Sequence, residues 1–325
     1  MEKLGSSVCP AGNTAAIDGD QAREIGRCVI IVVLNAPPGS IIFRFSRSIP
    51  KQLTETGMTI LSFVTATLLL LTASVFGLWV TRASLYRNLG TLQAAHRKRP
   101  ADLAGLIPGH VRLPKFDQRL VRMENILPRD VFEPIREEIA GLVDTERSYL
   151  LSHKKGGTVA YETLLQKAPR TVQLYLSGEL SDLISAIVGE AVGPTPLYDQ
   201  SSCSVLFYER PGDHIGWHFD HNFYRGRHLT VLIPILNTGH GPDGLSSARL
   251  EARIDGVAQF VSTPPNTLIM FEGQKVLHRV TPIDKDERRV ILSMTFATDS
   301  SANLLQGIKR RIKDTAFFGL RALWT

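Results

Sequence analysis

Cysteine is scarce in this chain of 325 residues, which contains only Cys9, Cys28 and Cys203. So few cysteines exclude a fold that depends on a framework of disulfides. Only Cys203 lies in the part of the chain where we expect the main domain, so that domain has no internal disulfide, which slightly favours the cytosol. We expect Cys203 to be a small buried hydrophobic residue.

Charged residues are absent between Thr56 and Thr81. A helix needs about 20 apolar residues to cross the hydrocarbon layer of a membrane. A buried helix of a globular domain seldom stays apolar all round for this length, so we expect one transmembrane helix over 58–80, with Trp79 at an interface. A cleaved signal peptide fits less well, because the run is long and lies well inside the chain. Met58 supports the hypothesis that translation naturally starts there.

The charges that flank this segment indicate its orientation. The C-terminal flank carries five cations and the N-terminal flank three: Arg82, Arg87, Arg97, Lys98 and Arg99 against Arg44, Arg47 and Lys51. The positive-inside rule therefore places the C-terminal side in the cytosol. The margin is small, and the family resemblance given below favours the secretory lumen, which stays the alternative.

The overall composition is that of a globular protein, with 43% hydrophobic and 21% charged residues. The net charge is +6, but the cations are scattered and are not interleaved with aromatic residues. We therefore expect no nucleic-acid partner, and we interpret the positive charge as a property of the membrane flanks and of solubility.

Two histidines and one aspartate stand out within short apolar stretches. His218 and Asp220 are two residues apart, so on an extended chain their side chains point to the same face. His278 lies in a second apolar stretch, 275–280. Two imidazoles and one carboxylate on one face of an octahedron are the ligand set of non-haem Fe(II) oxygenases. A surface pair of His218 and Asp220 is the simpler alternative.

A zinc site that uses His214 and His218 is the chemical competitor. This spacing suits a helix, but Pro211, Gly212 and Gly216 break a helix here. In addition, no glutamate follows His214, as the hydrolytic zinc motif requires. The sequence therefore favours iron.

The pattern around these residues indicates helices first and short strands afterwards. Amphipathic helices are expected over 130–143, where Asp130 to Glu133 resembles a capping box, and over 180–188. Strands separated by turns follow from 198 onward, and Asp255-Gly256 predicts a hairpin. This order predicts an α+β domain with a double-stranded β-helix, or jelly roll. We interpret the stretch 152–158 as a solvated loop.

Several of these residues form a frame with recognisable spacing. The frame consists of Tyr208-x-x-x-Gly212, His218-x-Asp220, a strand from Arg227 through Thr230 to Asn237, the late His278, and Arg288 ten residues after it. It resembles the prolyl 4-hydroxylase-like branch of the 2-oxoglutarate and Fe(II)-dependent dioxygenases over roughly 123–298. The interval from Tyr208 to His218 is one residue longer than is usual in this branch, and the usual Gly-Gly-Glu-Thr turn is replaced at 238–245.

The resemblance implies a set of roles. His218, Asp220 and His278 would be the catalytic residues that bind Fe(II). The distal carboxylate of 2-oxoglutarate needs a buried cation, for which we choose Arg288; Arg289 is the rival, because adjacent residues of a strand face opposite ways.

Tyr208, with Thr230 beside it, would contact the same cosubstrate. The reaction consumes O2 and 2-oxoglutarate, releases succinate and CO2 and hydroxylates a substrate. Ascorbate is a further cofactor that the resemblance allows.

The expected organisation has five parts. They are an N-terminal segment without regular structure (1–57), the transmembrane helix (58–80), a basic linker (81–122), the dioxygenase domain (123–298) and a basic C-terminal tail (299–325). The substrate is a protein, with a prolyl residue as the family suggests, or a small molecule or lipid near the bilayer. The alternative function is a degenerate jelly roll that binds a metal or a partner without turnover.

Overall fold

The computed structural model describes residues 27–36, 39–48, 51–99, 101, 103, 113–114, 116, 119–142, 146–147, 154–319 and 322, with the side chains of 27–59 and of Glu146 left out. The chain divides into two units, Met1–Gly77 and Leu78–Thr325. Each is described by itself.

The N-terminal unit contains a hairpin and the start of a long helix. Strands β1 (Arg27–Ala36) and β2 (Gly39–Ser48) pair antiparallel, within the segment that we expected to lack regular structure. The remainder of that expectation, on 1–26, lies outside the described residues. Helix α1 (Lys51–Arg97) follows. By length and composition its stretch from Ile60 is apolar enough to cross a membrane, and none of the apolar window is buried.

Helix α1 continues well past the expected end of the span and enters the second unit. Its residues at 82, 86, 89, 93 and 96 follow the alternating spacing of four and three that places side chains on one helical face. This face packs against the domain: Leu89 is fully buried, and Gln93 donates to the Tyr161 hydroxyl at 3.0 Å. The first part of the segment expected as a linker is therefore a packed helix.

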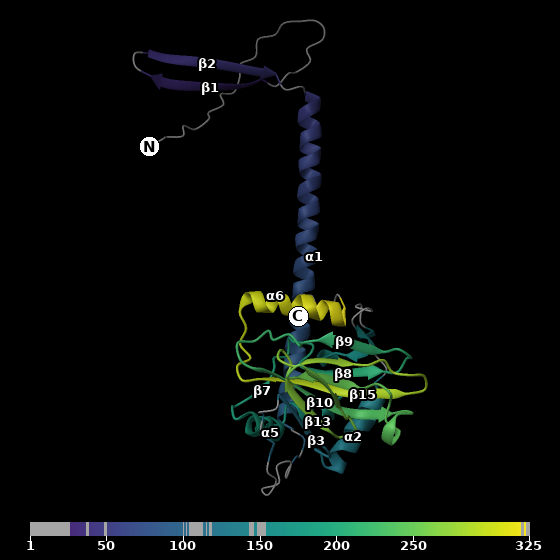
Figure 1. The fold of residues 1–325 in the computed structure, drawn as a ribbon. Helices are drawn as coiled ribbons and strands as arrows, with labels where there is room; N and C mark the ends of the chain where they lie inside the picture. The colour runs from purple at the N-terminus through teal and green to yellow at the C-terminus, as the bar shows by residue number, and fades with distance from the viewer. Residues whose placement is uncertain are drawn as a thin grey trace. The chain divides into compact units, whose positions relative to one another are not determined.

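Two antiparallel sheets form the centre of the second unit (Figure 1). The larger sheet has the order β3-β13-β10-β15-β8-β6-β4, with β7 paired to β15, and the smaller has the order β12-β11-β14-β9-β5. The strands of the larger sheet are β3 (Leu120–Met123), β4 (Glu146–Arg147), β6 (Gly157–Val159), β7 (Gly193–Pro194), β8 (Cys203–Tyr208), β10 (His228–Thr238), β13 (Leu268–Glu272) and β15 (Arg288–Ala297). Those of the smaller sheet are β5 (Lys154–Lys155), β9 (His214–His218), β11 (Leu250–Ile254), β12 (Val257–Val261) and β14 (Leu277–Val280). This arrangement confirms the predicted jelly roll.

The helices of this unit are short, apart from the C-terminal one. They are α2 (Arg129–Ala140), α3 (Tyr161–Lys167), α4 (Pro169–Tyr175), α5 (Gly178–Val188), the single 3-10 turn η1 (Pro242–Gly244) and α6 (Leu304–Phe318). The predicted capping box does not form, because α2 begins at Arg129 and its N-cap is Pro128, which has no side-chain donor or acceptor. The hairpin predicted at Asp255-Gly256 joins β11 to β12, and both turn residues have positive φ.

Alternation along the strands separates two cores. In β15 the even-numbered residues from Val290 to Phe296 join the core beneath α2 to α5. Ile291 belongs instead to the second core, which lies between the two sheets together with Tyr208 and Phe271. Cys203 is buried in the first core, as expected. The face of the larger sheet that carries Ile291 therefore also forms one wall of the cavity between the two sheets.

Candidate functional site

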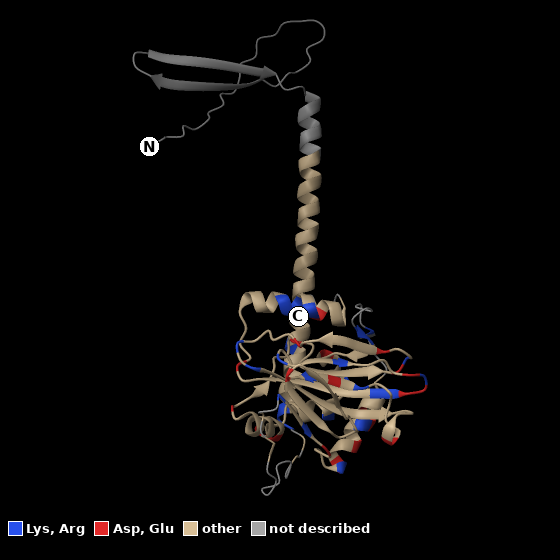
Figure 2. Ribbon diagram, in the orientation of Figure 1, with Lys and Arg blue, Asp and Glu red and all other residues tan. Residues whose placement is uncertain are grey.

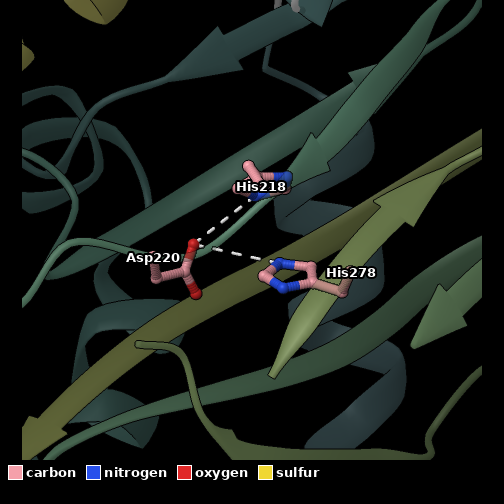
Figure 3. A group of neighbouring side chains, drawn as sticks. All are labelled: His218, Asp220 and His278. Atoms are coloured by element: carbon pink, nitrogen blue, oxygen red, sulfur yellow. Dashed lines mark ion pairs between the residues drawn. The ribbon is translucent and has the colours of Figure 1, made fainter. Parts of the chain in front are cut away.

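Three side chains converge where the smaller sheet faces the larger one (Figure 3). His218 is the last residue of β9, Asp220 follows two residues later, and His278 lies in β14 directly opposite His218. The Oδ1 atom of Asp220 is 3.5 Å from Nε2 of His218 and 3.9 Å from Nε2 of His278. The one candidate ligand atom of each residue lies within 4.8 Å of the others.

The geometry of this cluster fits a metal ion. Two atoms that bind one ion at about 2.1 Å each lie no more than about 4.2 Å apart, and both Nε2 to Oδ1 distances are shorter. The Nδ1 atom of His218 is 2.8 Å from the Gly216 carbonyl, and that of His278 is 3.0 Å from the Val276 carbonyl. A carbonyl only accepts, so Nδ1 carries the proton and each Nε2 presents its lone pair to the centre.

The charge states of the cluster also suit a metal. Burial acts to raise the pKa of Asp220, but the neighbouring His278 and His218 and a hydrogen bond from Thr230 outweigh it and hold that pKa well below its usual range. Burial lowers the pKa of His278. An ionised carboxylate and a neutral imidazole are the forms that bind cations.

Asp220 is held in place from two sides. The Thr230 hydroxyl on β10 donates to the Asp220 Oδ2 atom at 2.6 Å, and the Asp220 backbone amide donates to the Gly273 carbonyl at 2.9 Å. Glycine is required at 273, because a Cβ atom there would lie 2.4 Å from the Cβ atom of Asp220. Thr230 thus contacts the carboxylate of the candidate metal cluster, a contact that the sequence did not reveal.

The three ligands border a cavity of about 180 Å³ that residues of both sheets line. Tyr208 on β8 and Arg289 on β15 are paired across their strands, and both line this cavity. The Arg289 guanidinium carbon lies 5.4 Å from the centre of the Tyr208 ring. Burial raises the pKa of Tyr208 to about 12, so its hydroxyl stays protonated and can donate a hydrogen bond.

Arg289 is fully buried, and its Nε atom has no hydrogen-bond partner within the described part of the chain. Burial lowers its pKa, and the opposing influence comes from Tyr208 rather than from an acidic side chain. A buried guanidinium without a carboxylate is costly unless a ligand supplies the anion.

Arg288, our choice from the sequence, does not reach this cavity. It is half exposed on the other side of the larger sheet, where its Nε donates to Glu209 Oε1 at 2.7 Å. The physical reason is the period of two along β15. Arg289 shares the face of Ile291, which is turned to the cavity, and Arg288 points to the opposite face of the sheet. The structure therefore corrects the phase that we assigned to this strand.

Lys154 is a cavity residue that the sequence did not reveal. Within the stretch 152–158, which we expected to be a solvated loop, the structure forms β5 and the start of β6, and Lys154 is buried. Its Nζ atom donates to Thr158 Oγ1 at 2.8 Å and lies 5.3 Å from the centre of the Phe317 ring. Burial, with the nearby charge of Lys313, lowers the pKa of Lys154 to about 8.

The competing zinc pair is not assembled. His214 opens β9, and its Nδ1 atom bonds the Gly212 carbonyl at 2.8 Å. Within the described residues the cluster of potential metal ligands consists of His218, Asp220 and His278, without His214. The arrangement supports the iron-type ligand set.

Comparison with known proteins gave one matching family model. The model of the halogenase D family matches residues 113–240, a stretch that includes Tyr208, His218 and Asp220. No curated protein matches the chain.

Solved structures with similar folds include several oxygenases. A prolyl 4-hydroxylase from Pseudomonas putida is 17% identical, with 56% of this chain and 92% of that chain covered and a TM-score of 0.42. A prolyl hydroxylase from Trichoplax adhaerens, in complex with a peptide of hypoxia inducible factor, is 14% identical, with 65% and 91% covered and a TM-score of 0.45. A member of the 2OG-Fe(II) oxygenase family from Burkholderia pseudomallei is 14% identical, with 58% and 89% covered and a TM-score of 0.42. Identities this low leave the substrate open.

The jelly roll is the fold that the resemblance to the 2-oxoglutarate and Fe(II)-dependent dioxygenases implies, and the structure brings together the three residues to which that resemblance assigns the iron.

Proposed function

We propose that this chain is a membrane-anchored oxygenase that uses Fe(II), 2-oxoglutarate and O2 to hydroxylate a protein or small-molecule substrate, with release of succinate and CO2. The observation that carries the proposal is a single cavity that combines the three candidate ligands with Arg289, a buried cation for which the described residues supply no carboxylate. A degenerate binding domain has no need for that cation, so its retention favours turnover.

His218, Asp220 and His278 would hold the iron, which with its cosubstrate supplies the oxidising power for attack on a carbon–hydrogen bond. Arg289 would bind the distal carboxylate of 2-oxoglutarate by charge-assisted hydrogen bonds. The Tyr208 hydroxyl would donate to the same carboxylate from the neighbouring strand. Thr230 would keep Asp220 oriented through its hydrogen bond to Oδ2.

Hydroxylation fits the ligand set better than halogenation, despite the match to the halogenase D model. Three protein ligands, a bidentate cosubstrate and dioxygen fill an octahedral coordination sphere. With Asp220 in place as a ligand, no position remains for a halide. Within the described part of the chain, no feature supports a role for ascorbate.

A second buried cation, Lys154, also lines the cavity. The described residues give it a hydroxyl partner and no carboxylate, so a substrate with an anionic group is favoured. Peptides with a prolyl residue stay within the proposal through the family resemblance alone.

The membrane location rests on the apolar stretch of α1. We propose that the oxygenase domain, roughly 123–298, faces the cytosol, because the cations that follow the apolar stretch outnumber those before it. In sealed membrane vesicles whose cytosolic side faces outward, we expect added protease to digest the domain, whereas its protection there would indicate the opposite orientation, toward the lumen.

The test of the activity is release of succinate from 2-oxoglutarate by the full-length chain in detergent with Fe(II). We expect uncoupled turnover without a substrate, and its loss in Asp220→Ala together with loss of bound iron. His214→Ala is the matched control, since this histidine lies on the same strand outside the ligand cluster. If the unsubstituted chain neither releases succinate nor binds 2-oxoglutarate, the proposed enzyme activity is refuted and the degenerate binding domain is the remaining hypothesis.

A further inference from the structure

The C-terminal helix α6 exposes its aliphatic face and buries its charged face, the reverse of a surface helix in a soluble domain. Its large aliphatic residues face outward: Leu304 is 83% exposed, Leu305 59%, Ile308 46% and Ile312 62%. Their spacing of three to four residues makes one stripe along the helix. A single exposed aliphatic residue is ordinary, but a continuous apolar patch marks a surface that contacts something.

Charged residues occupy the opposite, inner face of α6. Arg310 and Asp314 are buried and paired at 2.9 Å, and Lys313 lies 2.8 Å from the other Asp314 oxygen. Lys313 also donates to Ser201 Oγ at 2.6 Å. Lys313 also pairs with the buried Asp199 at 3.5 Å. These contacts of Lys313 with the loop at 199–201 fix the rotation of the helix about its axis, so that the aliphatic stripe cannot turn inward without breaking a buried ion pair.

The borders of the stripe carry positive charge. Successive residues of a helix are about 100° apart, which places Lys309 on one side of the stripe and Arg311 on the other, and both are exposed. Figure 2 shows the cluster of basic residues on α6. The single acidic residue of the helix, Asp314, is on the buried side. An apolar face bordered by cations is complementary to an anionic membrane surface.

The domain holds α6 next to the segment that leads to the proposed membrane span. Gln200 bonds the Tyr86 hydroxyl of α1 at 3.1 Å, and the next residue, Ser201, bonds Lys313 of α6. Along the chain, Tyr86 follows the last residue of the uncharged stretch, Thr81, by five positions. We therefore propose that the aliphatic stripe of α6 lies in the headgroup region of an anionic bilayer.

This contact has a consequence for the cavity. Lys313, Phe317 and Phe318 of α6 line the cavity that contains the metal ligands. With the outer face of α6 on the bilayer, the cavity wall formed by its inner face lies at the membrane interface. Substrates presented there reach the site without crossing bulk solvent. The inference shares the membrane location with the proposed function and is independent of turnover.

The test uses the full-length chain with Cys9→Ser and Cys28→Ser, reconstituted into vesicles of phosphatidylcholine and phosphatidylglycerol. An environment-sensitive fluorophore is attached through Ile312→Cys, and quenching by lipids with nitroxide headgroups is measured. Val257→Cys is the matched control, because Val257 on the β11–β12 hairpin is 63% exposed, an exposed fraction similar to the 62% of Ile312. A third label, through Leu68→Cys, reports on the proposed span.

We expect quenching and a blue shift of the label at 312 but not of the label at 257. Lys309→Gln with Arg311→Gln is expected to weaken docking of α6 about tenfold or more, since each cation near an anionic surface contributes about 1 kcal/mol. Equal behaviour of the labels at 312 and 257 would overturn the inference, whereas an unquenched label at 68 would overturn the span alone. Shielding at 312 that depends on protein concentration and not on lipid would identify a second copy as the partner and also overturn it.

Discussion

Tyr208 and Arg289 face each other across neighbouring strands of the larger sheet, with the guanidinium carbon 5.4 Å from the centre of the phenol ring. Both side chains are buried in the cavity that the metal ligands border. The pair offers a fixed positive charge and a protonated hydroxyl to one ligand carboxylate. We expect this pair to bind the distal carboxylate of 2-oxoglutarate.

Removal of the Arg289 charge is expected to weaken binding of 2-oxoglutarate. Loss of one partner of a buried, hydrogen-bonded charge pair costs roughly 2–5 kcal/mol, so Arg289→Met should raise the Kd for 2-oxoglutarate by about 30-fold or more. Calorimetry under anaerobic conditions, with Mn(II) in place of iron, measures this without turnover. Arg288→Met is the control and should bind normally, because Arg288 lies outside the cavity. The opposite result for these two variants would restore our first assignment of the strand.

The hydroxyl of Thr230 is expected to support metal affinity through Asp220. Groups that hydrogen-bond a metal ligand typically contribute 10- to 100-fold in affinity, so Thr230→Val should weaken Fe(II) binding by about tenfold. Metal content after dialysis against a graded chelator reports the change. Thr230→Ser keeps the hydroxyl and should restore most of the affinity. If the serine variant is as weak as the valine variant, packing of the methyl group is responsible and not the bond to Oδ2.

Gly273 permits the close approach of Asp220, and a methyl group at this position would collide with it. The Cβ atom of alanine would lie 2.4 Å from the Asp220 Cβ and 2.6 Å from Oδ2. We expect Gly273→Ala to displace the carboxylate and to lower Fe(II) affinity by about tenfold or more, the size of effect seen when support of a ligand is lost. Gly178→Ala is the control, since a Cβ atom there meets nothing within 4 Å. Unchanged iron binding in Gly273→Ala would show that the loop can shift at no cost to the site.

Lys154 is expected to make stability depend on pH in the alkaline range. Its pKa in the folded protein is about 8, below its usual value of 10.5. Below pH 8 the lysine is charged in both states, and folding carries the full cost of burying it, about 3 kcal/mol. Above pH 8 the folded state loses the proton first, so this cost declines and disappears as the pH passes the unfolded pKa.

The variant Lys154→Met should therefore be more stable than the unsubstituted chain at pH 7, by up to about 3 kcal/mol, and the difference should vanish near pH 10.5. Denaturant unfolding of the protein without substrate, at pH 7, 9 and 10.5, measures both. Lys155→Met is the matched control at the next position, where the ammonium group bonds the Pro211 carbonyl near the surface. Destabilisation by Lys154→Met at every pH would indicate an anionic partner for Lys154 within the protein.

The sequence alone predicted the fold class and singled out His218 and Asp220 as a pair, because both predictions depend on local spacing. The separation of His218 and Asp220 by one residue places both on one face of an extended chain, whatever surrounds them. Alternation and turn residues such as Asp255-Gly256 defined the strands in the same way. The apolar stretch near the N-terminus needed only its length and its lack of charge.

The phase of β15 was in principle readable from the sequence. Ser293 and Thr295 share the face of Arg289, whereas the even-numbered positions from Val290 to Phe296 share the face of Arg288 and are all apolar. A polar cavity wall would therefore have indicated Arg289. The spacing of ten residues from His278, taken from the family frame, outweighed this signal.

Only the tertiary structure decided which groups meet across the chain. The burial of Lys154 depends on the packing of β5 against β9 and of Phe317 above it, and the requirement for glycine at 273 depends on Asp220, 53 positions away. The sequence of α6 shows an apolar face and a charged face, but local spacing carries no information on which of them is turned inward. The ion pair of Lys313 with the buried Asp199 and the hydrogen bond from Lys313 to Ser201 decide that, and they leave the aliphatic face outside.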